Sequence, residues 1–220
     1  MVLKDMSYNN FIRGIKLQFA SSVLTIVNNI LSLLFTLSIL FMLTDPTQGF
    51  IAMFGIMIVS FLINTASCII NSVSWFFMYK DEHRYFMKAF IVSLFPPAVF
   101  VFGVIITQLF NLNSSFVISN IYSVFFIAMY YFAISGINTV VKETDRPDII
   151  RFGKILIVLQ AISSVMPFIQ AINFPDNLSI IKPLLIISSL VISIIYCIYI
   201  RKLNILFIGN QPEIEEEETK

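Results

Sequence analysis

The feature that most constrains this chain is the segment of residues 50–79, about thirty residues long, which contains no charged residue. At 1.5 Å per residue, an α-helix of that length spans about 45 Å, more than the roughly 30 Å of a bilayer's hydrocarbon core. Five further apolar segments approach or exceed spanning length: 17–43, 89–112, 116–141, 155–174 and 183–200. The pattern predicts an all-α membrane protein with six transmembrane helices.

The composition agrees with this class. Hydrophobic residues make up 58% of the chain and charged residues only 12%, whereas soluble domains average about 25% charged residues. The net charge of +1 excludes a strongly basic protein built to bind nucleic acid. We therefore expect the lipid bilayer, and no nucleic acid, as a partner.

Basic residues are concentrated in alternate connecting segments, which predicts the topology. Residues 80–88 and 142–154 each contain several lysines and arginines, whereas residues 44–49 and 111–115 contain none. Because basic loops remain on the cytoplasmic side of a membrane, we expect both termini in the cytoplasm and the chain in the cell membrane. Lys182 is then the one basic residue on the outer side.

This topology divides the chain into three parts and indicates an internal repeat. We expect a cytoplasmic segment at 1–16, a six-helix transmembrane domain at 17–208 and an acidic, disordered cytoplasmic tail at 209–220. An arginine precedes a lysine by three or four residues before each odd-numbered helix, which favours three tandem helical hairpins. The alternative is that any helix entering from the cytoplasm gathers basic anchors.

Three prolines lie inside the predicted helices. Pro96 and Pro97 fall in the third apolar segment and Pro167 in the fifth. Proline removes a backbone donor and clashes with the preceding turn, so we expect a kink or break at each site. Such a feature serves either as a fixed packing kink or as a hinge or binding site of unwound backbone.

Polar residues recur every three or four positions along the first two apolar segments, a spacing that places them on one helix face. An amide facing lipid would leave donors and acceptors unpaired, so each stripe should face protein or water. The stripe of the first segment comprises Ser21, Thr25, Asn28, Asn29 and Ser32, and that of the second comprises Ser60, Asn64, Ser67, Asn71 and Ser74.

The short turn between these two segments predicts an antiparallel hairpin in which the two stripes face each other or a shared centre. The stripes then either pair across helices, at about 0.6 kcal/mol for each contact, or line a cavity for a small neutral or weakly charged solute. Shorter stripes could extend the same centre: Gln160, Ser163 or Ser164, Pro167 and Gln170 in the fifth segment, and Ser189, Ser193 and Tyr196 or Cys197 in the sixth.

The sequence contains no pattern typical of a catalytic or metal site. No Asp, Glu, Lys, Arg or His lies deep within any predicted span, although proton relays and intramembrane metalloproteases need such groups. The single histidine, His83, lies in a loop beside Asp81 and Glu82 without the ligand spacing of a known metal site. We therefore expect no enzyme activity, no metal and no cofactor.

Two loops resemble a pattern in uncharacterised prokaryotic six-span integral membrane proteins. In the segment KETDRPDIIRFGK (142–154) a short charged loop follows a hairpin, and in RYFMKAFI (84–91) a basic-aromatic-basic entry starts the next hairpin. The resemblance implies six helices and assigns no activity, cofactor or site residue.

These observations predict a non-enzymatic membrane protein, either a homo-oligomer or one subunit of a membrane complex. The leading interpretation is a transport or pore-forming component for a small solute that uses the two polar stripes. The alternative is an accessory protein of regulatory or immunity type, which binds a membrane partner through helix seams or through the loops at 80–88 and 142–154.

Overall fold

The computed structural model describes residues 9–42, 44–80, 84–95, 114–142, 144–173 and 181–208, and all its regular elements in these ranges are helices. A helical segment at 84–95 lies between α2 and α4 in the chain. The bounds of the long helices are α1 (Asn9–Phe41), α2 (Pro46–Tyr79), α4 (Ser114–Lys142), α5 (Pro147–Asn173) and α6 (Ile181–Ile208). The predicted all-α class is confirmed.

Four stretches of these helices are long and apolar enough to cross a membrane: Asn9–Ile39, Pro46–Tyr79, Val124–Lys142 and Leu185–Phe207. They support the membrane class, while six crossings and the orientation remain predictions. Most of the third apolar segment, including Pro96 and Pro97, lies outside the described residues. Helix α5 continues through Pro167 to Asn173, so the chain does not break there, because neighbours can satisfy the backbone that a proline frees in a membrane helix.

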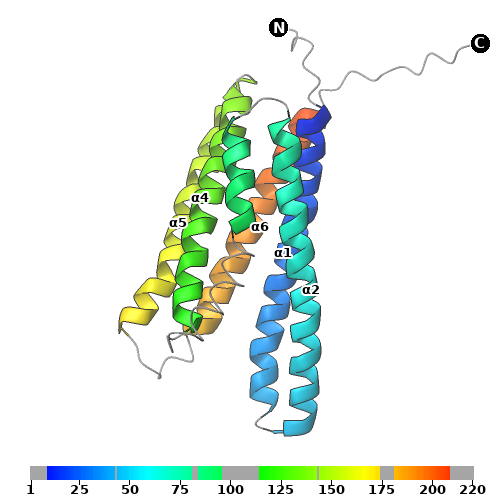
Figure 1. Cartoon of the computed structure of the whole chain (residues 1–220), viewed down its shortest axis with the longest axis vertical. Helices are drawn as coiled ribbons and strands as arrows, with labels where there is room; N and C mark the ends of the chain where they lie inside the picture. Colours follow the sequence, from blue (N-terminus) through cyan, green and yellow to red (C-terminus); the bar gives the residue numbers. More distant parts are fainter. Residues whose placement is uncertain are drawn as a thin grey trace, which may run out of the picture.

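The helices form an elongated bundle in which α1 packs against α2 and α6, and α5 packs against α4 and α6. The start of α1, the end of α6 and the α4–α5 turn lie at one end, and the α1–α2 turn lies at the other (Figure 1). We call the first the basic end, because it gathers Arg13, Lys16, Lys80, Arg84, Lys88, Lys142, Arg146, Arg151, Lys154, Arg201 and Lys202. The connectors rich in lysine and arginine thus lie at one end of the bundle, and the α1–α2 turn, which has none, lies at the other.

The α1–α2 turn has a defined helix start. Asp45 adopts an extended conformation as the N-cap of α2, and its carboxylate accepts a hydrogen bond from the Gln48 backbone N–H at 3.1 Å. Pro46 follows at the first helical position, where its missing N–H removes no helical hydrogen bond. These local signals close the hairpin after a short turn, as the sequence predicts.

The packed core of the described residues lies toward the basic end. It includes large side chains that are almost fully buried, among them Phe11, Trp75, Phe86, Tyr199 and Leu203. By contrast, the half of the α1–α2 hairpin nearer to Asp45 exposes Ile30, Leu34, Leu37, Phe54, Ile58, Phe61 and Leu62. The bundle is therefore packed toward the basic end, whereas the far half of the α1–α2 hairpin exposes apolar side chains that suit contact with lipid.

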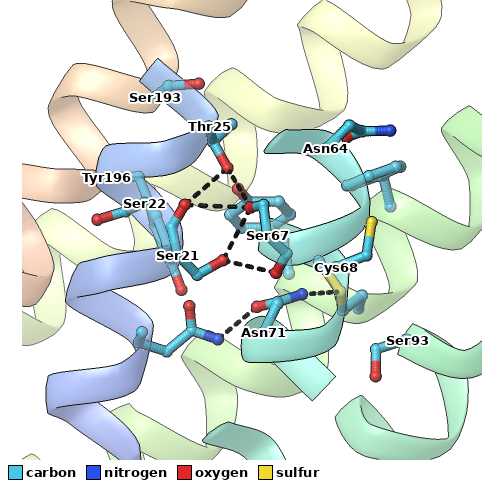
Figure 2. Close-up of a pocket in the computed structure, with 14 residues that line it drawn as sticks. Ser21, Ser22, Thr25, Asn64, Ser67, Cys68, Asn71, Ser93, Ser193 and Tyr196 are labelled. Carbon is cyan, nitrogen blue, oxygen red and sulfur yellow. Dashed lines mark hydrogen bonds between the residues drawn. The ribbon is translucent and has the colours of Figure 1, made fainter. Parts of the chain in front are cut away.

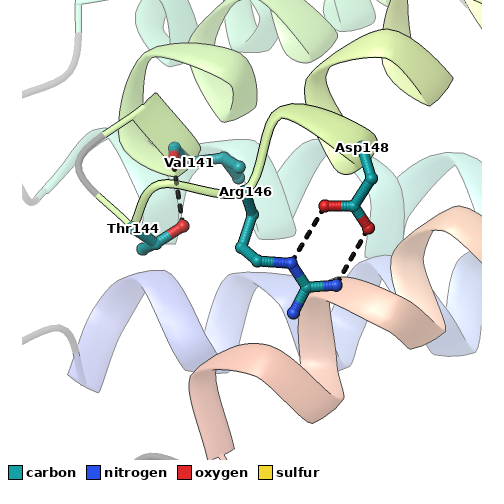
Figure 3. Close-up of polar contacts among 4 residues, drawn as sticks. All are labelled: Val141, Thr144, Arg146 and Asp148. Carbon is teal, nitrogen blue, oxygen red and sulfur yellow. Dashed lines mark hydrogen bonds and ion pairs between the residues drawn. The ribbon is translucent and has the colours of Figure 1, made fainter.

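The α4–α5 turn is held by an exposed ion pair (Figure 3). Asp145 has a φ of 54°, a left-handed conformation that aspartate tolerates better than most residues. Arg146 then donates two hydrogen bonds of 2.9 Å, from Nε and Nη2, to the Asp148 carboxylate. Pro147 and Asp148 occupy the first turn of α5, where proline fits and a negative charge complements the helix dipole.

The ion pair leads to a prediction about pH. The hydrogen bonds from Arg146 lower the pKa of Asp148 to about 2. Because this pKa is lower in the folded chain than the usual value of about 4, the pair stabilises the fold above about pH 4 and its effect disappears as the pH falls through about 2. Both side chains are exposed, so Asp148→Asn should lower the unfolding temperature only slightly and by a constant amount from pH 5 to 8. A difference that changes across pH 5–8 in thermal unfolding curves would contradict this assignment.

Candidate functional site

The polar stripes of α1 and α2 meet directly at three hydroxyl groups. Ser21 Oγ donates to the backbone carbonyl of Ser67 at 3.1 Å and also lies 3.1 Å from Ser67 Oγ. Thr25 Oγ1 lies 3.0 Å from the same Ser67 Oγ (Figure 2). The predicted hairpin with facing stripes is confirmed at this level.

Farther from the basic end, the two adjacent asparagines of α1 bind different helices. Ser60 Oγ of α2 donates to Asn28 Oδ1 at 2.6 Å, and Asn29 Nδ2 donates to Ser193 Oγ of α6 at 2.9 Å. Ser32 instead donates to the backbone carbonyl of Asn28 in its own helix. The same turn of α1 therefore contacts both α2 and α6. Through Ser193, the polar stripe of the sixth segment joins the stripes of α1 and α2.

Nearer to the basic end, an amide chain crosses from α1 to α4. Gln18 Nε2 donates to Asn71 Oδ1, and Asn71 Nδ2 donates to Met129 Sδ of α4 at 3.2 Å. Gln18 was absent from the predicted stripe, although it lies three residues before Ser21 and continues the same spacing. Ser74 donates to the Asn71 backbone carbonyl at 2.6 Å, so it bonds within its own helix.

Between these contacts lies a pocket of about 90 Å³ formed by α1, α2, the helical segment 84–95, α4 and α6 (Figure 2). Its volume holds a few water molecules and is well below the roughly 300 Å³ of a typical ligand site. None of its lining residues is charged. Besides the stripe residues Ser21, Thr25, Asn64, Ser67 and Asn71, the lining includes Gln18, Ser22, Cys68, Ser93, Tyr130, Ser193 and Tyr196.

Several polar groups of the pocket remain available to a guest molecule. Within the described part of the chain, the hydroxyls of Tyr130 and Tyr196 and the amide of Asn64 have no hydrogen-bond partner. The two tyrosine rings pack edge to face at 5.0 Å. The Asn64 side chain is exposed, so the lining reaches the surface of α2. These groups could donate to or accept from water or a small solute.

The described residues Gln160 and Ser164 of the fifth-segment stripe do not line this pocket. Gln160 Nε2 lies 3.3 Å from Ser164 Oγ, one turn along the same helix, and neither residue lines the cavity. The spacing predicted a shared face for these two residues correctly, but it could not show whether that face lines the pocket. Among the described residues, no three His, Cys, Asp or Glu side chains gather as metal ligands.

Four helices long and apolar enough to cross a membrane, arranged around a small uncharged polar pocket, indicate the class of α-helical membrane proteins. No protein-family model, curated protein or solved structure matches the chain. The inference of function therefore depends on the chemistry of the pocket.

Proposed function

We propose that this protein is a transport or pore-forming component of the cell membrane for a small, neutral, hydrogen-bonding solute. The observation that carries the proposal is the uncharged polar pocket, whose tyrosine hydroxyls and Asn64 amide are available to a guest. In this proposal the chain crosses the membrane six times with both termini in the cytoplasm, and acts as a homo-oligomer or as a subunit of a complex.

The position and chemistry of the pocket support this role. Ser21 is five residues from Lys16 of the basic end, a rise of about 7.5 Å along α1. Farther along the same helix, the Asn28–Ser60 and Asn29–Ser193 contacts continue the polar track toward the middle of the bundle. A pocket that lacks charges pays little to exchange water for a neutral polar molecule, whereas an ion would lose its hydration without a compensating charge.

Solute flux into proteoliposomes tests the proposal. The double substitution Asn64→Leu and Asn71→Leu removes two amides from the lining, each worth about 0.5–1.5 kcal/mol as a hydrogen-bonding group. We expect the uptake of glycerol or urea, measured by stopped-flow light scattering, to fall about tenfold.

Thr65→Leu is the matched control. Thr65 is the next residue along α2 and is exposed, but it bonds to the Phe61 carbonyl of its own helix and does not line the pocket. Its flux should equal that of the unmodified protein. A folded double variant with unchanged flux for every solute tested would overturn the proposed function.

One observation favours the accessory-protein alternative. The Asn64 amide is exposed on a face of α2 that also exposes Phe61, and it has no hydrogen-bond partner in the described part of the chain. A partner helix could satisfy that amide. Co-purification in mild detergent of a stoichiometric protein that Asn64→Leu removes, with no measurable flux, would favour this role.

A further inference from the structure

The basic end carries positive charge that the carboxylates of the described residues leave almost entirely uncompensated. Within the described ranges, the one ion pair joins Arg146 and Asp148. The remaining lysines and arginines of this end have exposed side chains and no carboxylate within ion-pair distance in those ranges. So many like charges at one end of a bundle repel one another unless anions lie among them.

Aromatic rings hold three of these lysines at defined positions. Lys80 Nζ lies 5.1 and 5.5 Å from the ring centroids of Phe76 and Phe77. Lys88 Nζ lies 5.5 Å from the ring of Phe132 in α4 and 5.9 Å from that of Tyr85.

The third lysine, Lys202 of α6, lies 5.2 Å from the ring of Phe152 in α5. The three lysines thus lie at different places in the basic end: the end of α2, the contact of the segment 84–95 with α4, and the contact of α5 with α6. A ring positions an ammonium group without neutralising its charge.

Each of these lysines also borders apolar surface one turn or less away. Phe76 is 40% exposed beside Lys80, Ile91 is 43% exposed beside Lys88, and Ile198 is 46% exposed beside Lys202. Rings and lysines in this arrangement are typical of the level where headgroups meet hydrocarbon. A molecule that satisfies both surfaces must therefore present an anion joined to an acyl chain.

We propose that Lys80, Lys88 and Lys202 bind the phosphate groups of anionic phospholipids in the leaflet at the basic end. Each headgroup accepts hydrogen bonds from one ammonium group, while its acyl chains cover the neighbouring apolar side chains. A nucleic acid or a soluble acidic protein would match the charge and leave that apolar surface uncovered. The inference is independent of whether the pocket carries a solute.

Lipid retention by the full-length protein tests the proposal. The protein is reconstituted in nanodiscs with equal amounts of phosphatidylglycerol and phosphatidylcholine, and native mass spectrometry then counts the lipids that remain bound. We expect phosphatidylglycerol to be preferred about fivefold at each lysine. In the triple variant Lys80→Gln, Lys88→Gln and Lys202→Gln, the preference should fall close to one.

Two controls keep the result interpretable. Lys182→Gln changes a lysine in the first turn of α6, at the opposite end of the bundle, and should leave the preference unchanged. In the unmodified protein, the preference should also fall as NaCl is raised from 0.05 to 0.5 M, because salt screens exposed charges. This second measurement needs no substitution, so it stands even if the triple variant does not fold.

Three results would overturn the proposal: equal retention of both lipids, a preference that the triple variant keeps, or a preference that salt does not reduce. A fourth result would show instead that the lysines bind the chain's own acidic tail. In that case phosphatidylglycerol would be retained only after Glu213, Glu215, Glu216, Glu217 and Glu218 were all replaced by glutamine.

Discussion

Replacing Gly14 with alanine is expected to lower the unfolding temperature by about 2–8 °C, because α1 and α2 touch at this glycine. A Cβ atom built there would collide with Met78 Cγ and lie 2.8 Å from the Ser74 backbone carbonyl oxygen. The methionine side chain can move aside, but the carbonyl belongs to the α2 backbone. The two helices must therefore separate, at a cost of about 1–3 kcal/mol, which exceeds the gain of up to about 1 kcal/mol from better helix propensity.

Gly55→Ala is the matched control for this prediction. Gly55 is also inside α2, but nothing lies within 4 Å of a Cβ built on it. Alanine there should leave the unfolding temperature unchanged or raise it slightly, because only the propensity gain remains. The fluorescence of Trp75, the single tryptophan, reports unfolding from within the core. Equal unfolding temperatures for the two alanine variants would contradict the close contact at Gly14.

Silver ions are expected to react with Cys68 at least about tenfold faster than with Cys197, a barrier difference of about 1.4 kcal/mol. Both thiols are free and half-buried, and Cys68 lines the polar pocket whereas Cys197 does not. Silver reaches a thiol through water, so a thiol that lines a hydrated pocket reacts sooner than one surrounded by apolar side chains. A hydrated pocket therefore exposes Cys68 selectively.

The comparison uses two single-cysteine variants, Cys197→Ser and Cys68→Ser, in proteoliposomes. Thiols left after timed exposure to silver are counted with a fluorescent maleimide in denaturant. A lipid-soluble maleimide applied to the folded protein controls for simple burial and should label both thiols. Equal silver rates would show that the pocket is dry, and the stripes would then serve as contacts between helices.

Much of the α1–α2 arrangement follows from spacing alone. Helical spacing assigns Ser21 and Thr25 to the polar face of α1 and Ser67 to the polar face of α2. The short turn at Asp45 forces these two helices to run side by side. Gln18 could have been included by extending the same spacing one step toward the N-terminus. The sequence therefore contained the face, the partner helix and most of the contacting residues.

Other features of the pocket were beyond such reasoning. Tyr130 lies in an almost purely apolar run, where an aromatic residue is more often a packing residue, so nothing marked its hydroxyl as part of a polar site. Gln160 shares a face with Ser164, yet periodicity cannot say where that face points within the bundle. Which of two adjacent asparagines binds α2 and which binds α6 depends on the rotation of α1, and a single stripe leaves that rotation undetermined.

The uneven packing of the α1–α2 hairpin has a mechanical consequence. Its base, around Gly14 and Met78, is fixed among buried aromatic side chains, whereas its far half presents apolar surface to lipid on both helices. When the hairpin tilts about its packed base, the residues farthest from the base move the most. A small change in the Ser21–Ser67 contact, close to the fixed end, is therefore amplified along the hairpin into a larger displacement of the turn at Asp45.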